Sequence, residues 1–240
     1  MPIYKIAGEA IDFEPLYESN KRLCAGFLSQ KCEPAFSFKS DFNSIKEEML
    51  VEGDFSKNSS AKMLESNYIL RKIATYFLES GKGFVFHGSA VKYRGKAYVF
   101  TGVSGAGKST HAALWKSVLG EKLTYINDDK PIIKKINGDF YVFGTPWKGK
   151  HELGENDFAP LGGIAEIVKS KNIKVVDLPK SETIALFLNQ TLRPTETKIY
   201  DKLLPLLGEI MERYPIKKLY CDKSEKSAKS LIEEFTGEII

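Results

Sequence analysis

Apolar side chains recur at helical spacing between residues 63 and 80. The positions that carry them are Leu64, Tyr68, Ile69, Ile73, Tyr76 and Phe77. Because a helix brings residues three and four apart onto one face, this spacing predicts an amphipathic helix over 63–80, which Gly81 and Gly83 end. The stretch 51–62 before it is polar and rich in turn-forming residues, so we expect a loop and a boundary there.

The first fifty residues show shorter patterns. Residues 3–13 and 34–42 are rich in strand-forming side chains, which predicts two strands, and residues 14–30 between them favour a short helix. We therefore expect residues 1–80 to form a small N-terminal α+β accessory region, with residues 81–240 as the core of the protein.

Strand patterns dominate the middle of the chain. Two β-rich runs, 83–93 and 96–103, are joined by Arg94-Gly95, a pair suited to a tight turn. Residues 109–118 then favour a helix.

The remaining sequence continues this mixture. The run 122–144 carries the hairpin signal Asn137-Gly138, residues 145–160 lack periodicity and predict a long loop, and residues 161–179 predict another hairpin. The last sixty residues show helix, helix, strand and helix patterns in that order. Hairpins in the middle of the chain and helices at its end predict an α/β or α+β fold with a mixed sheet, and we expect α/β.

Composition and charge exclude several classes of protein. Of the 240 residues, 42% are hydrophobic and 28% are charged, as in ordinary globular proteins, and the net charge of +4 is spread along the chain. No basic block suggests a nucleic-acid partner, no apolar run is long enough for a membrane span, and the first residues carry acidic side chains where a signal peptide carries basic ones. Three cysteines make a poor disulfide framework and fit a reducing compartment. We expect a cytoplasmic protein.

The stretch "TGVSGAGKST", residues 101–110, matches the pattern G-x-x-x-x-G-K-[ST] of a phosphate-binding loop (P-loop). A strand pattern precedes it and a helix pattern follows, as such a loop requires. Small residues let backbone N–H groups approach a polyphosphate closely. The predicted nucleotide-binding residues are Gly102, Ser104, Gly105, Ala106, Gly107, Lys108, Ser109 and Thr110. Lys108 would reach the β- and γ-phosphates, and Ser109 would bind Mg²⁺.

Two acidic residues follow the P-loop by twenty positions. Asp128 and Asp129 come directly after an apolar, strand-like run. Because neighbouring residues of a strand face opposite ways, one carboxylate could bind the metal and the other could act on a nucleophile. The alternative is a solvated turn.

Three histidines are distributed differently around these motifs. His87 lies between two apolar strand halves, upstream of the P-loop. Paired with Asp128 it could tune a base near neutral pH, or it could be a packed structural residue. His111 lies inside the helix after the P-loop and is expected to be structural, and His151 lies in the long loop.

Candidate substrate contacts lie after the acidic pair. Trp147, Lys148 and Lys150 fall on the loop 145–157, where an aromatic ring and two cations could clamp an acceptor or the nucleotide, unless the tryptophan simply packs on the surface. Arg193, between two predicted helices, could bind a phosphate or could be a solvated cap.

The order of these motifs carries a resemblance. "HGSAV", "RG", "VFTGVSGAGKST" and "INDDK" follow one another as in the catalytic core of HPr kinase/phosphorylase, and a similar P-loop and aspartate pair occur in phosphoenolpyruvate carboxykinases. The match covers roughly residues 85–135. Together with "GTPWKGK" and "QTLRPTE", it makes the chain similar to stand-alone HPr-kinase-like proteins.

The resemblance implies a fold and a set of roles. It implies a mixed-sheet P-loop core of the HPr kinase/phosphoenolpyruvate carboxykinase type, with ATP and Mg²⁺. It also implies that Asp128 acts as the base on a serine hydroxyl, that Asp129 holds the metal, and that His87 supports Asp128.

We therefore expect an ATP-dependent kinase whose acceptor is a serine-type hydroxyl on a protein, a peptide or free serine. The alternatives are a nucleotide-binding regulatory or scaffold protein with little catalysis, and a small carboxykinase-like enzyme. The intact aspartate pair favours the kinase over the scaffold. The chain length argues against the carboxykinase, which needs a large domain for its organic acid. The oligomeric state is not predicted.

Overall fold

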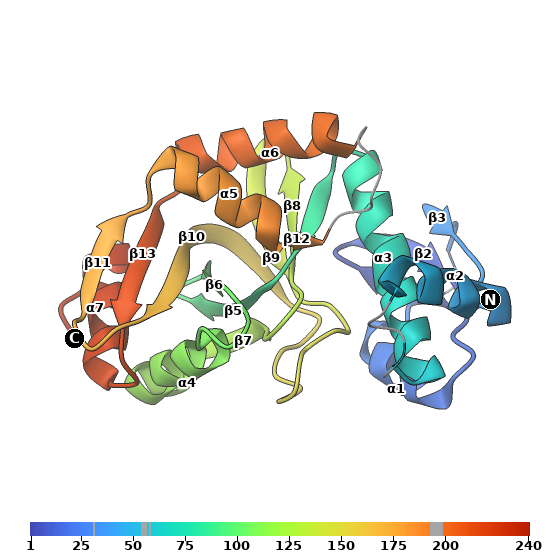
Figure 1. Ribbon diagram of the computed structural model, residues 1–240, viewed down its shortest axis with the longest axis horizontal. Helices are drawn as coiled ribbons and strands as arrows, with labels where there is room; N and C mark the ends of the chain where they lie inside the picture. Colours follow the sequence, from blue (N-terminus) through green and yellow to red (C-terminus); the bar gives the residue numbers. More distant parts are fainter. Residues whose placement is uncertain (31, 54–56, 58, 193–198) are drawn as a thin grey trace.

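A computed structural model describes residues 1–30, 32–53, 57, 59–192 and 199–240 (Figure 1). The helices are α1 (Glu18–Cys24), α2 (Phe42–Glu52), α3 (Ala61–Glu79), α4 (Lys108–Leu119), α5 (Lys180–Gln190), α6 (Tyr200–Arg213) and α7 (Glu225–Thr236). The strands are β1 (Ile3–Ile6), β2 (Glu9–Asp12), β3 (Phe36–Ser37), β4 (Gly83–Phe86), β5 (Gly88–Tyr93), β6 (Lys96–Thr101), β7 (Leu123–Asn127), β8 (Ile132–Ile136), β9 (Asp139–Phe143), β10 (Phe158–Lys169), β11 (Lys174–Asp177), β12 (Thr191–Leu192) and β13 (Ile216–Cys221). The fold is mixed α/β, as the sequence predicts.

The long strand β10 joins two parts of a ten-stranded sheet. Residues 158–160 pair antiparallel with β9, residues 161–166 pair parallel with β6, and residues 164–169 pair parallel with β13. The strand order is β12-β4-β8-β9-β10-β6-β5-β7, with β13 beside β10 and β11 beside β13. The part formed by β12, β4, β8, β9 and the start of β10 is therefore antiparallel. The part formed by the rest of β10 with β6, β5, β7, β13 and β11 is mixed.

Strand direction brings several strand ends to one edge of the mixed part. Strands β6, β10 and β13 are parallel, and β7 runs the same way as β6 because both pair antiparallel with β5. The carboxyl ends of β7, β6, β10 and β13 therefore meet at the same edge. In open α/β sheets this edge is where ligands bind.

Helices cover both faces of the mixed part because its central strands are apolar on both sides. In β6, Tyr98 and Phe100 pack with Trp115 of α4 and Leu231 of α7, whereas Val99 on the other face packs with residues of α5 and α6. Figure 1 shows α5 and α6 on the side of the sheet opposite to α4. A strand buried on both faces is the expected environment for the strand that leads into a P-loop.

The predicted hairpin over 161–179 is wrong. Strand β11 follows β10 along the chain, yet it pairs antiparallel with β13, and β13 lies between them. The turn after β10 looks like a hairpin turn in sequence, but strand β13 from the end of the chain inserts beside β10. The hairpin at Asn137-Gly138 is confirmed, with φ of 50° and 91° at its two residues.

The first eighty residues differ from the prediction in detail. Residues 3–13 form two strands, β1 and β2, around a turn at Ala7-Gly8, and the strand expected over 34–42 shrinks to Phe36–Ser37. Helix α2, which the sequence patterns do not indicate, begins with a capping box between Asp41 and Ser44. Helix α3 confirms the predicted helix over 63–80.

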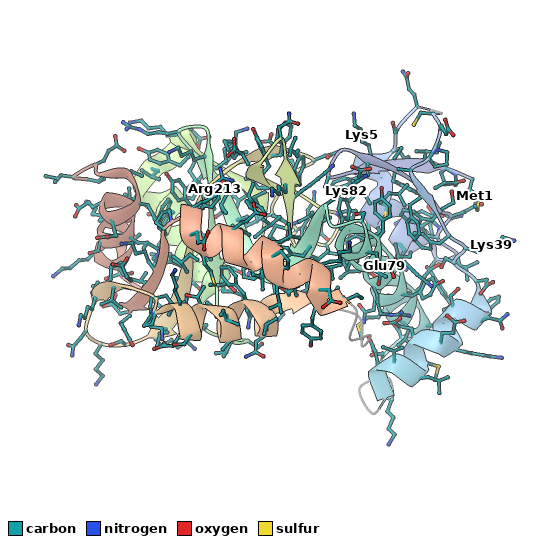
Figure 2. The ribbon with its side chains drawn as sticks, turned by 90° about the horizontal axis from the view of Figure 1, so that it is seen from above. Met1, Lys5, Lys39, Glu79, Lys82 and Arg213 are labelled. Atoms are coloured by element: carbon teal, nitrogen blue, oxygen red, sulfur yellow. The ribbon has the colours of Figure 1, made fainter. Side chains whose placement is uncertain are left out.

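The N-terminal segment packs against the large sheet. Figure 1 shows it at one end of the molecule. One hydrophobic cluster combines Phe77 of α3 with Val85 of β4 and with Trp147. Lys134 of β8 donates a 2.6 Å hydrogen bond to Glu9 of β2, which also accepts one from Lys82. Figure 2 shows Lys82 between the N-terminal segment and the sheet. The boundary at residue 80 stays a prediction.

Among the described residues, no helix combines the length and the apolar character that crossing a bilayer requires. The cysteines Cys24, Cys32 and Cys221 are all free thiols.

Candidate functional site

The predicted P-loop, residues 102–107, lies between the end of β6 and the start of α4. Gly102, Gly105 and Gly107 have φ of 138°, 76° and 107°, which side-chain-bearing residues rarely adopt. At Gly102 a Cβ atom would also lie 3.0 Å from the carbonyl oxygen of Ile167. The predicted order of strand, loop and helix is observed, and the glycines are required by the backbone.

Lys108 begins α4 with its ammonium group held against the loop. Its Nζ donates hydrogen bonds to the carbonyl oxygens of Gly102 at 3.1 Å and Val103 at 3.4 Å, and the residue is 8% exposed. Burial lowers the pKa of Lys108, and the charge of Lys130 lowers it further, while Asp129 and Asp128 raise it. The lysine, both aspartates and Lys130 are therefore close enough to interact electrostatically.

Asp128 is buried at the end of β7 and is only 4% exposed. The hydroxyl of Ser89 donates a 2.7 Å hydrogen bond to its Oδ1. Burial raises the pKa of Asp128, and hydrogen bonds from Ser89 and Ser109 and the charge of His151 partly offset that rise. The carboxylate of Asp128 thus lies beside the hydroxyl of the P-loop residue Ser109, and His151 of the long loop lies nearby.

Asp129 faces a different set of partners. Its Oδ1 lies 3.3 Å from Nε2 of His87 and accepts a 2.8 Å hydrogen bond from Nζ of Lys130. Burial raises the pKa of Asp129, but hydrogen bonding to His87 and the charge of Lys130 outweigh it and lower the pKa to about 2. The sequence predicts a pairing of His87 with Asp128; the structure pairs His87 with Asp129 instead.

Asn127 explains why the two neighbouring carboxylates diverge. Its side chain is fully buried, and Oδ1 accepts hydrogen bonds from the backbone N–H groups of Asp129 at 2.9 Å and Lys130 at 2.7 Å. This local bond turns the chain sharply after β7. Its Nδ2 donates to Thr145, which ties the turn to the long loop. Neither Asn127, Ser89 nor Lys130 is among the residues that the sequence singles out, although "NDDK" contains two of them.

The loop 145–157 packs over this turn. Gly149, at φ 72°, approaches so closely that a Cβ atom there would lie 3.1 Å from Cβ of Asp129. The Trp147 ring is buried in the cluster with α3, and its Nε1 donates a 3.0 Å hydrogen bond to Ser66. Trp147 therefore anchors the loop and does not present its ring at the surface.

The other candidate substrate contacts have different surroundings. Lys148 is half-buried and Lys150 is exposed on the same loop. Arg193 lies outside the described residues.

His111 is buried one turn into α4, in agreement with the prediction that it is a structural residue. It is 2% exposed, and Nε1 of Trp115 donates a 3.1 Å hydrogen bond to its Nε2. Burial lowers the pKa of His111 to about 3. The ring is therefore neutral at physiological pH.

The similarity of the chain to known proteins is to solved structures. No protein-family model matches the chain. No curated protein matches it either. Among solved structures, the chain is similar to the Hpr(Ser) kinase/phosphatase from Coxiella burnetii, with a TM-score of 0.29 and 13% sequence identity, over 54% of this chain and 88% of that one. A TM-score this low shows neither a shared fold nor a shared activity.

Proposed function

We propose that this protein is an ATP- and Mg²⁺-dependent kinase that transfers the γ-phosphoryl group to a serine-type hydroxyl. The observation that carries the proposal is the position of the buried Asp128 carboxylate beside the Ser109 hydroxyl, at the start of the helix that follows the P-loop. A P-loop alone binds phosphate. A P-loop whose serine meets a carboxylate at the end of a neighbouring strand also provides the protein ligands for a metal.

Ser109 and Asp128 fit Mg²⁺ by the chemistry of their donors. A hydroxyl and a carboxylate oxygen are hard ligands, and Mg²⁺ takes one or two protein carboxylates and completes its shell with phosphate oxygens and water. The described residues contain no cluster of three His, Cys, Asp or Glu side chains that could hold a metal by themselves, which agrees with a site of this shared kind. When bound, the metal would neutralise charge on the β- and γ-phosphates.

The contacts favour an exchange of the two aspartate roles that the family resemblance implies. Asp128 touches the P-loop serine, so we assign it to the metal. Asp129 touches His87 and lies under Gly149 of the long loop, so we assign it to the acceptor hydroxyl. Its low pKa is compatible with this role, because phosphoryl transfer has a loose transition state in which the nucleophile needs orientation more than early deprotonation.

The chemical step then has a simple balance. The bond between the γ-phosphorus and the β–γ bridging oxygen breaks, a bond from the acceptor oxygen to the γ-phosphorus forms, and the hydroxyl proton passes to the Asp129 carboxylate. Lys108 and Lys130 provide fixed positive charge where negative charge accumulates. The loop 145–157, held by Trp147 and Ser66, covers this side of the site and would exclude water that otherwise hydrolyses ATP.

The test is a transfer assay with ATP labelled at the γ-phosphate. The purified protein is incubated with Mg²⁺ and, in separate reactions, with free serine, serine-containing peptides and oxaloacetate. The proposal predicts acid-stable phosphoserine in one of the first two reactions, and none with Lys108→Ala. Formation of phosphoenolpyruvate above the ATPase background would show a carboxykinase instead. Binding of ATP without transfer to any of these acceptors would favour the regulatory alternative.

A further inference from the structure

The loop 145–157 meets the end of β7 at two places, and both are contacts with Asn127. At the start of the loop, the carbonyl and hydroxyl oxygens of Thr145 each accept a 3.1 Å hydrogen bond from Nδ2 of Asn127. Towards its other end, Gly154 forms an antiparallel bridge with Asn127, so close that a Cβ atom on Gly154 would lie 2.8 Å from Cα of Asn127. One fully buried residue therefore contacts both ends of the loop.

The side-chain amide of Asn127 is divided between the acidic turn and the loop. Its oxygen accepts from the backbone N–H groups of Asp129 and Lys130, and its nitrogen donates to Thr145. An amide can serve both sides because it carries an acceptor oxygen and two donor hydrogens, whereas an ionised carboxylate carries acceptors only. The position of the turn and the position of the loop are thus set by one group.

Thr145 completes the link between the loop and the turn. Its side chain is fully buried, and its hydroxyl donates a 2.8 Å hydrogen bond to the carbonyl oxygen of Lys130 while accepting one from Asn127. A hydroxyl can donate and accept at the same atom, which an apolar side chain of the same size cannot do. The three residues form a closed ring of hydrogen bonds, and buried networks of this kind hold their members rigidly when every group is satisfied.

The middle of the loop is close to the carboxylate that we assign to the acceptor hydroxyl. A Cβ atom on Gly149 would lie 3.1 Å from Cβ of Asp129. The backbone N–H of Lys130 also donates to the carbonyl oxygen of Trp147 at 3.3 Å. A shift of the loop relative to the turn would therefore change the space beside Asp129.

We propose that Thr145 is a positioning residue for phosphoryl transfer. Through Asn127 and the backbone of Lys130, it holds the loop against the acidic turn, so that the acceptor hydroxyl and not water receives the phosphoryl group. The inference rests on the proposed function, and it deepens that function by naming the residue that suppresses hydrolysis.

Transfer and hydrolysis share one bond cleavage and differ in the nucleophile. In both, the bond between the γ-phosphorus and the β–γ bridging oxygen breaks and ADP leaves. The new bond to phosphorus comes from the acceptor oxygen in transfer and from a water oxygen in hydrolysis, and the proton of that nucleophile passes to Asp129. A loop that excludes water and fixes the acceptor therefore determines which product forms.

The experiment measures phosphoserine and ADP in the same reaction, with γ-labelled Mg-ATP and whichever of free serine or a serine-containing peptide the wild type phosphorylates. Thr145→Val keeps the size of the side chain and removes the hydroxyl, and Thr145→Ser keeps the hydroxyl. Thr183→Val is the matched control, because Thr183 is also buried and its hydroxyl donates to the carbonyl oxygens of Leu178 and Pro179 at the start of α5.

We expect Thr145→Val to lower the yield of phosphoserine per ADP at least about tenfold. Its affinity for Mg-ATP should stay within about threefold of the wild type, since Asp128 has its own hydrogen bond from Ser89. Thr145→Ser should restore most of the yield, and Thr183→Val should keep the wild-type yield. A loss of stability alone lowers both products in proportion and leaves their ratio unchanged.

Melting curves verify that each variant folds. If Thr145→Val does not fold, Asn127→Ser takes its place, because it removes the Nδ2–H donor and leaves a hydroxyl that can still accept from the turn. The same fall in phosphoserine per ADP is expected for this variant.

The results that would overturn the inference differ from those that would overturn the proposed function. A wild-type ratio of phosphoserine to ADP in the folded Thr145→Val variant, an equal fall in Thr183→Val, or no recovery in Thr145→Ser would show that the Thr145 hydroxyl does not position the loop, and the kinase function would stand. If the wild type phosphorylates neither free serine nor the peptides, the proposed function is wrong, and the inference is overturned with it.

Discussion

Nε2 of His87 lies 3.3 Å from Oδ1 of Asp129, while the neighbouring Asp128 turns away to the hydroxyls of Ser89 and Ser109. Two adjacent carboxylates thus have separate environments, one with cations and a histidine and one with hydroxyls beside the P-loop. The difference makes their roles separable by substitution.

Replacement of each aspartate by asparagine should give different kinetic effects. We expect Asp129→Asn to bind Mg-ATP nearly normally and to lose roughly 10²-fold or more in kcat, as expected for a positioned proton acceptor. Asp128→Asn should weaken Mg²⁺-dependent ATP binding. Steady-state kinetics and titrations with and without Mg²⁺ measure both effects. The opposite pattern would restore Asp128 as the base and Asp129 as the metal ligand.

Removal of the Lys108 side chain should abolish phosphoryl transfer and weaken ATP binding. The ammonium group, now bonded to the carbonyl oxygens of Gly102 and Val103, is the charge closest to where the β- and γ-phosphates would lie. Lys116→Ala, further along the same helix, is the control for general effects on α4. Equal turnover by wild type and Lys108→Ala with any acceptor would contradict a P-loop mechanism.

Gly149→Ala tests whether the loop must approach the acidic pair. Its added Cβ would meet Asp129 Cβ at 3.1 Å, so we expect a fall in kcat of roughly tenfold or more as the loop or the carboxylate shifts. Gly95→Ala is the matched control: its φ is also 72°, no atom lies within 4 Å of its added Cβ, and it lies in the turn between β5 and β6. A fall in kcat of the same size in both variants would show that backbone strain, and not the contact with Asp129, is responsible.

The ion pair between Glu9 and Lys134 should make stability depend on pH. Burial raises the pKa of Glu9, but hydrogen bonds from Lys134 and Lys82 outweigh it and lower the pKa from 4.5 to about 2. A lowered folded-state pKa stabilises the protein above the unfolded value, so this contribution is present above pH 4.5 and is lost as the pH falls toward 2.

Glu9→Gln should therefore lower the free energy of unfolding at pH 7 by an amount on the order of 1–3 kcal/mol and have little effect near pH 2. Denaturant titrations between these limits measure the difference. The exposed Glu47→Gln serves as the control. A loss of stability that is the same at both pH values would exclude the ionised carboxylate as its source.

Local patterns predicted much of the protein because they depend on neighbouring residues. The glycine-rich turn at 102–107, the helix after it and the Asn137-Gly138 hairpin follow from glycine conformations and periodicity that a short stretch contains. Helix α3 was predicted for the same reason. Its amphipathic face is complete within nineteen residues.

The errors came from contacts between distant parts of the chain. Strand β11 pairs with β13, about forty residues later, and no pattern within residues 161–179 indicates that partner. His87 interrupts what looks like one strand, and β4 and β5 on its two sides join different parts of the sheet. The histidine therefore reaches Asp129 through a break that periodicity does not reveal.

The loop that covers the acidic pair belongs to the same cooperative unit as helix α3, because Trp147 of the loop donates a hydrogen bond to Ser66 and packs in the same cluster as the helix. Regions of a protein that share a packed cluster open together when local unfolding occurs. Mild denaturation or proteolysis that loosens α3 would therefore release this loop and disturb β4, β8 and β9, which contribute Val85, Ile132 and Phe143 to the same cluster, while the mixed part of the sheet around β6, which packs in a separate cluster, stays folded. The proposed activity would then be lost at a lower denaturant concentration than the mixed part of the sheet, and the packing of the first eighty residues would set its resistance to inactivation.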